Sequence, residues 1–68
     1  MNKFEFVEMI ISLRKKFKSA KSWARYEIDE HLRAVKENEC ELNKTYIEVL
    51  KTCSKWSDVE EIYINFII

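Results

Sequence analysis

His31, the only histidine of the chain, ends the segment Glu27-Ile28-Asp29-Glu30-His31. An imidazole beside carboxylates can bind a metal ion or transfer protons. However, a carboxylate-bridged di-iron site uses Glu-x-x-His, and the residue three positions before His31 is Ile28. A zinc protease motif needs a second histidine one helical turn away, and the chain has none. We therefore interpret Glu27 and His31, which lie one turn apart, as an ordinary surface pair.

Cys40 and Cys53 are the only cysteines. A zinc site that combined them with His31 would need a fourth ligand, and the chain lacks a close Cys-x-x-Cys pair. A cysteine nucleophile activated by His31 is compatible with the spacing, because such partners need not be close in sequence. However, the chain contains no glycine, so a phosphate-binding or dinucleotide-binding loop is excluded. We expect two reduced thiols, no catalytic residue, no metal site, no cofactor and no enzymatic activity.

Charge is distributed very unevenly along the chain, although the formal net charge is zero. Residues 1–26 contain seven basic and two acidic residues, whereas residues 27–68 contain five basic and ten acidic ones. Between Arg14 and Arg25 there are six cations and no anion. This segment is the strongest candidate for a binding surface, and its proposed partner-binding residues are Arg14, Lys15, Lys18, Lys21, Trp23 and Arg25.

Three interpretations of this basic stretch remain open. Its cations could be solvated and placed favourably near a helix C-terminus. They could instead face an acidic surface, either of a partner or of residues 27–41 in a second copy. If one helix continued through Ser19, one stripe of that helix would present four cations to such a surface: Arg14, Lys18, Lys21 and Arg25. Finally, they could bind nucleic-acid phosphates, with Trp23 available to stack on a base. Trp23 and Tyr26 become interface candidates only if their side chains are exposed.

The elements that position these residues are expected to be helices. The chain contains neither proline nor glycine, and tight β-hairpin turns usually need glycine. We predict one all-α domain over residues 1–68, a compact bundle of three or four short helices at approximately 3–19, 22–37, 41–54 and 58–67. A helical homodimer is the main variant of this prediction.

The first helix shows a capping-box spacing at Asn2 and Glu5, and Ser19 or Ser22 is expected to cap the second helix. In the first helix, one face is predicted to contain Phe6, Ile10, Leu13 and Phe17, beside a second apolar row of Phe4, Val7 and Ile11. We therefore expect the first helix to be covered on more than one side.

From Ile28 to Trp56 the apolar residues follow alternating steps of four and three, interrupted at Glu39. We predict a turn near residues 37–41, with Asn38 and Glu41 as a capping box. The alternative is one helix over about 22–56, which would extend about 50 Å at 1.5 Å per residue and would require a dimer.

The last segment is predicted to begin at Ser54 or Ser57, with Glu60 completing a capping box after Ser57. Its apolar residues are spaced as a helical face, although residues 62–68 also favour a strand. This tail is expensive to expose, so it either packs into the domain or joins two chains through Tyr63, Phe66 and Ile67.

The chain shows no secretion-signal pattern and no apolar run of the roughly 20 residues that cross a bilayer, so we expect a cytoplasmic location without membrane contact. We predict a small regulatory or accessory protein that binds another protein and sterically blocks or recruits it. Its composition is compatible with an AT-rich genome, which suggests a phage- or plasmid-type inhibitor of a host protein. The alternative is a nucleic-acid-binding regulator that uses the basic segment 14–25.

Overall fold

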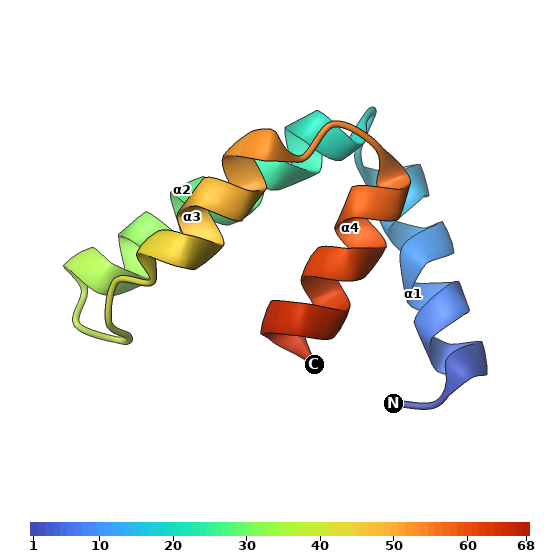
Figure 1. Cartoon of the computed structure of the whole chain (residues 1–68), viewed down its shortest axis with the longest axis horizontal. Coiled ribbons are helices and arrows are strands. Elements are labelled where there is room, and N and C mark those ends of the chain that lie inside the picture. Colours follow the sequence, from blue (N-terminus) through green and yellow to red (C-terminus); the bar gives the residue numbers. More distant parts are fainter.

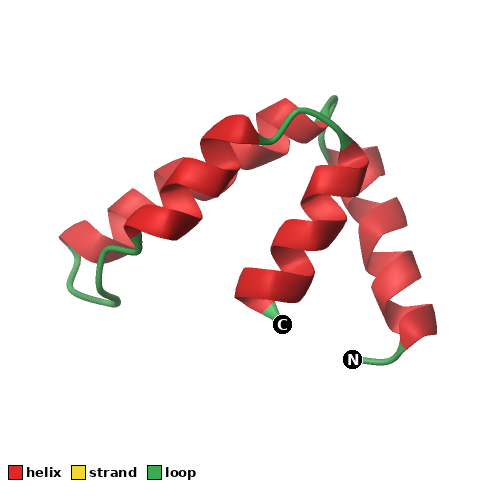
Figure 2. Cartoon of the chain, in the orientation of Figure 1, coloured by secondary structure: helices red, strands yellow, loops and turns green.

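Four α-helices and a short C-terminal π-helical segment make up the fold, which contains no strand (Figure 2). The computed structural model describes all residues, 1–68. The elements are α1 (Lys3–Lys16), α2 (Ala20–Lys36), α3 (Lys44–Thr52), α4 (Trp56–Ile62) and η1 (Tyr63–Ile67). The all-α prediction is therefore confirmed, with four helices close to the predicted ranges. The homodimer stays a prediction.

The helices are arranged in two arms that meet at a corner (Figure 1). Helices α2 and α3 run antiparallel and side by side in one arm, while α4 and α1 descend from the corner in the other. The molecule measures 33 × 24 × 19 Å along its principal axes. Each arm leaves one outer face of its helices without cover from the rest of the chain.

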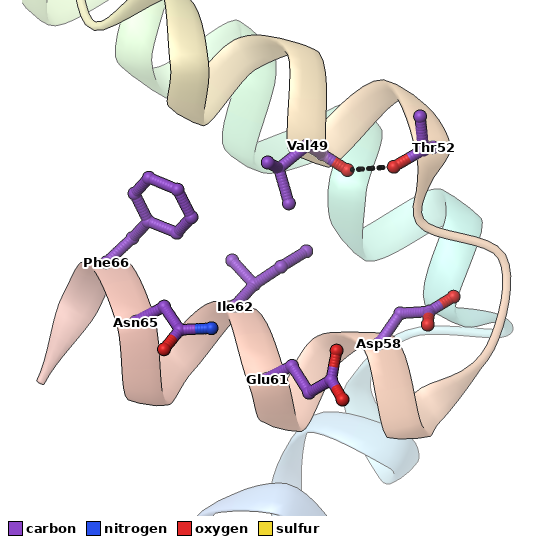
Figure 3. Close-up of a pocket in the computed structure, with 7 residues that line it drawn as sticks. All are labelled: Val49, Thr52, Asp58, Glu61, Ile62, Asn65 and Phe66. Carbon is purple, nitrogen blue, oxygen red and sulfur yellow. Dashed lines mark hydrogen bonds between the residues drawn. The ribbon is translucent and has the colours of Figure 1, made fainter.

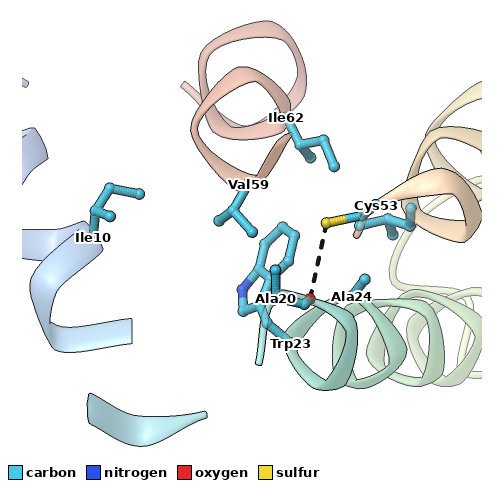
Figure 4. Close-up of a cluster of buried hydrophobic side chains, with 8 residues drawn as sticks. Ile10, Ala20, Trp23, Ala24, Cys53, Val59 and Ile62 are labelled. Atoms are coloured by element: carbon cyan, nitrogen blue, oxygen red, sulfur yellow. Dashed lines mark hydrogen bonds between the residues drawn. The ribbon is translucent and has the colours of Figure 1, made fainter. Parts of the chain in front are cut away.

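The hydrophobic core lies where the two arms meet (Figure 4). Trp23 of α2 is at its centre with a fully buried side chain, and Tyr63 stacks on it with ring centroids 5.6 Å apart. The thiol of Cys53 is also buried and donates to the carbonyl oxygen of Ala20 at 3.8 Å. All four helices or their ends contribute to this core, whose buried members are Ile10, Ala20, Trp23, Ala24, Leu50, Cys53, Val59 and Ile62.

Both predicted caps in the first part of the chain are present. The backbone N–H of Glu5 donates to the Asn2 side chain at 2.8 Å, and the Asn2 amide donates to the Glu5 carboxylate at 3.2 Å. Ser19 caps α2 by accepting from the backbone N–H of Ser22 at 3.1 Å, and the Ser22 hydroxyl oxygen accepts from the backbone N–H of Ser19 at 3.2 Å. Because Ser19 begins a new helix, α1 does not continue through it. The stripe expected for a continuous helix is therefore not formed by Arg14, Lys18, Lys21 and Arg25.

One of the two apolar rows of α1 packs against the core, as predicted. Ile10 is buried, and its row neighbours Phe6, Leu13 and Phe17 are half-buried. The second row is not covered by this chain, since Phe4, Val7 and Ile11 are all exposed. The expectation that α1 is covered on more than one side is therefore wrong for the single chain, because the remaining helices are too few and too short to reach its outer face.

The predicted turn between α2 and α3 is confirmed, and the single long helix is excluded. The turn begins with a Schellman motif: the backbone N–H of Glu39 donates to the carbonyl of Ala34, and that of Asn38 donates to the carbonyl of Val35. Asn38 therefore ends α2 in the left-handed region, at φ 61°, so its predicted role as a helix N-cap is wrong. Asn43 caps α3 instead, by accepting from the N–H of Tyr46 at 3.0 Å.

The C-terminal segment is helical, so the strand alternative for residues 62–68 is wrong. Its first helix, α4, begins before Ser57, and the predicted Ser57–Glu60 capping box does not form. The Asp58 carboxylate instead accepts from the backbone N–H groups of Ser54 at 3.0 Å and Lys55 at 3.3 Å. These hydrogen bonds lower the pKa of Asp58.

Candidate functional site

An open groove follows the seam between α2 and α3 on the outer face of their arm. It consists of two adjoining hollows that share Ile28 and Lys51. We call it the α2–α3 groove, and its floor consists of Ala24, Ile28, Leu32, Leu42, Ile47 and Leu50. The groove therefore spans most of both helices and is open to solvent along its length.

The floor of the α2–α3 groove is aliphatic and partly exposed. Ala24 and Leu50 are buried and close the groove from beneath. Leu32 is 47% exposed and Leu42 is 46% exposed, although both belong to the regular apolar spacing between Ile28 and Trp56. Removal of such apolar side chains from water contributes about 25 cal/mol per Å² before the entropic cost of association is subtracted. The exposed leucines at the turn end of the groove are thus an apolar surface that a partner can cover.

The rim of the groove is basic. Lys21 and Arg25 line it from α2, and Lys44 and Lys51 line it from α3. Its one acidic residue, Glu48, lies 3.6 Å from the ammonium group of Lys51 and is therefore already paired. No carboxylate lies within 4.0 Å of the other three cations. The rim consequently presents uncompensated positive charge on both sides of an apolar floor.

The helical repeat explains why α2 contributes both charge and apolar area to the groove. Lys21, Arg25, Ile28 and Leu32 follow one another at steps of four, three and four, which places them on one face of α2. The antiparallel arrangement then brings the start of α2 beside the end of α3. Lys21 and Arg25 therefore lie at one end of the groove and Lys44 at the other, whereas Lys51 lines both hollows.

The turn that holds the two helices together is built from side chains as well as backbone. The Nε2 atom of His31 accepts the backbone N–H of Asn43 at 3.0 Å, and the His31 ring packs edge-on against Tyr46. Arg33 lies close to three carboxylates and hydrogen bonds to Glu30, Glu37 and Glu39. This acidic cluster is therefore neutralised in part within the chain, which makes it a weaker target for the cations of a second copy.

The structure brings together only some of the predicted partner-binding residues. Lys21 and Arg25 both line the groove. Lys15 is exposed near the end of α1, and Lys18 is exposed in the connection between α1 and α2. The guanidinium of Arg14 lies 5.8 Å from the ring centroid of Trp56 in α4, so it packs against the other helix of its own arm. Arg14, Lys15 and Lys18 are accessible to a partner, but they do not line the groove.

Trp23 is not available to a partner, so its assignment as a contact residue is corrected. Its side chain is 0% exposed, because it faces the corner where α2 meets α4 and η1. Tyr26 is the aromatic residue of this region that reaches the surface, at 45% exposure, and its ring packs against Phe17. The basic segment therefore lacks the stacking tryptophan on which the nucleic-acid interpretation relied.

Another hollow, outside the α2–α3 groove, lies between α3 and the C-terminal helical segment, and its charged residues are acidic (Figure 3). Its apolar side chains, Val49, Ile62 and Phe66, are accompanied by Asp58 and Glu61. Asp58 is occupied in capping α4, and the hydroxyl of Thr52 donates to the carbonyl of Val49 at 2.9 Å. Two of the polar groups of this hollow thus serve the local helix geometry.

The titratable groups of the chain with shifted pKa values lie away from the groove. Partial burial raises the pKa of Glu27, while the hydroxyl of Tyr46, which donates to its carboxylate at 3.4 Å, acts in the opposite direction. Burial and the nearby Glu27 charge raise the pKa of Tyr46. Burial also raises the pKa of the Cys53 thiol, which keeps it protonated. These shifts follow from packing on the inner side of the α2–α3 arm and from the core.

His31 and Cys40 do come together, as one of the alternatives from the sequence required. The Nδ1 atom of His31 lies 3.9 Å from the sulfur of Cys40, which is a long and weak contact. Because Nε2 accepts from Asn43, the proton of the neutral imidazole is on Nδ1, where it faces the sulfur. His31 therefore closes the α2–α3 turn, and it also lines an open hollow with Cys40, Tyr46 and Phe66. No three histidine, cysteine or acidic side chains converge on a point that could hold a metal ion.

The groove residues that sequence reasoning missed are Lys44, Lys51 and the exposed leucines. Lys44 and Lys51 lie in residues 27–68, where acidic residues outnumber basic ones, so the charge distribution along the chain did not indicate a basic surface there. The stripe of Lys21, Arg25, Ile28 and Leu32 was a usable signal, because it joins two cations to two apolar residues on one helical face.

Fold and site together define a small all-α protein with an exposed, basic-rimmed apolar groove. Comparison of the chain with protein-family models, with curated proteins and with solved structures found no match. None of the helices combines the length and the apolar character that crossing a membrane requires.

Proposed function

We propose that this chain is a small regulatory or accessory protein that binds another protein through the α2–α3 groove. The observation that carries the proposal is the combination of partly exposed leucines with a rim of four basic residues. Protein interfaces typically combine an apolar centre with a polar or charged rim. The groove has this composition within one continuous face.

The mechanism that fits this surface is steric. The two helices of the arm are joined by a turn that backbone and side-chain hydrogen bonds fix at several points. A pre-organised face loses little conformational entropy on binding, which favours affinity from a small contact area. When this face covers a partner's surface, it either blocks another ligand of the partner or recruits the partner. Blocking would make the chain an inhibitor.

Nucleic-acid binding is the second candidate, because Arg14, Lys15, Lys18, Lys21 and Arg25 are all exposed and free of ion pairs. Phosphate binding needs such cations. Two features favour a protein partner instead: the floor of the groove is aliphatic, and Trp23 is buried. Aliphatic side chains offer no platform on which bases stack.

Affinity purification with the tagged chain distinguishes the two candidates. Lysate of the source organism is split, treated with nuclease or left untreated, and washed over a series of salt concentrations. A protein partner is expected to stay bound after nuclease treatment and to show a shallow salt dependence. Material that disappears with nuclease, with log affinity falling steeply against log salt, would instead support nucleic-acid binding.

A further inference from the structure

We infer that the occupant of the α2–α3 groove is an acidic amphipathic helix of the partner protein. This inference rests on the proposed function, since it specifies what a protein partner would insert. A helix placed in an apolar groove is a common mode of peptide recognition, in which residues on one helical face fill the groove. The dimensions and the charges of this groove fit that mode.

The length of the groove suits about three helical turns. It extends along α2 from Lys21 to Leu32, which corresponds to about 16 Å at 1.5 Å per residue. The floor is aliphatic throughout and offers no polar side chain to pair with a buried backbone group. A helix satisfies its own backbone hydrogen bonds, so it can lie on such a floor without leaving polar groups unpaired.

The charges specify the flanks of that helix. Lys21 and Arg25 lie without an ion pair at one end of the groove, Lys44 lies without one at the other, and the Glu48–Lys51 pair neutralises itself between them. The complementary helix therefore has an apolar row in its centre and carboxylates flanking that row at both ends. Charge complementarity of this kind determines the specificity and speeds the association.

Helices of a second copy match this pattern less well. The exposed row of α1 belongs to a helix with four basic and two acidic residues, which a basic rim repels. Segment 56–68 has acidic residues only at positions 58, 60 and 61, so its second half would leave Lys44 unpaired. The cluster around Glu37 is already occupied by Arg33. We therefore assign the groove to a separate partner protein.

The test uses three synthetic peptides of about 15 residues, long enough to span the groove at 1.5 Å per residue. The first has a leucine row at helical spacing and glutamates at both ends. The second has lysine in place of every glutamate, and the third is a scrambled version of the first. Each peptide is titrated into the ¹⁵N-labelled chain, and the amide shifts are followed by NMR. The glutamate peptide is expected to shift groove amides saturably, whereas the other two should bind at least about tenfold more weakly.

Two double variants test whether the basic residues of the groove rim determine which peptide binds. In Lys21→Glu/Arg25→Glu the preference is expected to reverse, so that the lysine peptide binds more tightly than the glutamate peptide. Lys3→Glu/Lys55→Glu makes the same change in charge at exposed positions outside the groove and should keep the original preference. Circular dichroism of both variants confirms that the helices are retained.

Several outcomes would overturn the inference. Equal binding of the scrambled peptide, or no shifts at any peptide concentration, would show that an acidic helix is not the ligand. Concentration-dependent shifts of the groove amides without peptide, abolished by Phe4→Asp or Ile64→Asp, would assign the groove to a second copy. If the peptides fail but a lysate protein is still retained and is lost with Leu32→Glu, the proposed function stands and only the acidic helix is rejected.

Discussion

The Nε2 atom of His31 in α2 accepts the backbone N–H of Asn43, the residue that caps α3, at a distance of 3.0 Å. The side chain of Asn43 then accepts from the N–H of Tyr46, so one chain of hydrogen bonds joins both helices of the groove. His31 thus connects α2 to the N-cap residue of α3, whereas its sequence neighbours indicated only a surface pair with Glu27.

Replacement of His31 by alanine is expected to destabilise the fold by about 1 kcal/mol, the usual net contribution of one hydrogen bond. The loss also leaves the N–H of Asn43 without its acceptor. Urea unfolding followed by circular dichroism measures the effect. Cys40→Ser is the matched control, because its sulfur makes only the 3.9 Å contact with the same ring. Equal midpoints for wild type and His31→Ala would contradict this role.

Asn38 is the one residue with a positive φ, at 61°, in a chain that has no glycine. Asn38→Ala is expected to cost about 1 kcal/mol, because a Cβ atom without a local hydrogen bond disfavours the left-handed region. Asn38→Gly should be neutral or slightly stabilising. Unfolding midpoints of the two variants test the Schellman motif, and an alanine variant as stable as the glycine variant would argue against it.

Trp23→Ala is expected to unfold the protein. Removal of a buried tryptophan typically costs 3–5 kcal/mol, about the whole stability of a domain of this size. Trp23→Phe should be milder, since it keeps a ring in the core and removes an indole N–H that has no hydrogen-bond partner in the chain. Circular dichroism at 222 nm reports helix content. A folded Trp23→Ala that loses only partner binding would restore Trp23 as a contact residue.

Glu27 is expected to make stability depend on pH in an unusual direction for a carboxylate. Its pKa is raised in the folded state, chiefly by burial, so the folded chain holds this proton more tightly than the unfolded chain does. Its contribution is fully present below the unfolded pKa and is lost as pH rises through the folded pKa. Glu27→Gln should therefore be more stable than wild type at pH 7, and the difference should shrink toward pH 4.

The measurement for Glu27 is the difference in urea midpoint between wild type and variant at each pH, which cancels the titration of the other carboxylates. Glu8→Gln is the control, since Glu8 is exposed and has no cation within 4.0 Å. A difference that grows as pH falls would have the wrong sign and would contradict the burial of Glu27.

The two thiols are expected to react very differently. Cys40 is exposed, whereas Cys53 is buried and burial raises the pKa of its thiol. Since the thiolate is the reactive form, a disulfide reagent should modify Cys40 rapidly in the folded protein and Cys53 only as the protein unfolds. Absorbance of the released thiolate follows both reactions. Rapid modification of Cys53 in Cys40→Ser would show that the core opens easily.

The helices could be predicted from the sequence because each has a strong local signal. The caps at Asn2 and Ser19 and the apolar spacing of α1 and α3 are local properties of the chain. The role of Asn38 was misassigned because an asparagine can begin one helix or end another, and only the direction of the neighbouring chain distinguishes the two.

The groove was harder to predict because it depends on contacts distant in sequence. Lys51 and Lys21 line the same hollow only because α2 and α3 pack side by side in antiparallel orientation. Leu32 and Leu42 belong to the same apolar pattern as buried Cys53, and periodicity alone does not show where the core ends. Likewise, Trp23 is adjacent to basic residues in sequence but points to the opposite side of α2, into the core.

Binding through the groove is tested most directly by comparing four forms of the chain in one nuclease-treated lysate. These forms are wild type, Leu32→Glu, Lys21→Glu/Arg25→Glu, and the control Lys3→Glu/Lys55→Glu. Quantitative mass spectrometry of the retained proteins should find one protein held by wild type and control and depleted at least about tenfold with both groove variants. Equal recovery of the retained protein with all four folded forms would contradict a protein-binding groove between α2 and α3. So would the retention of nucleic acid alone in a parallel lysate that is not treated with nuclease.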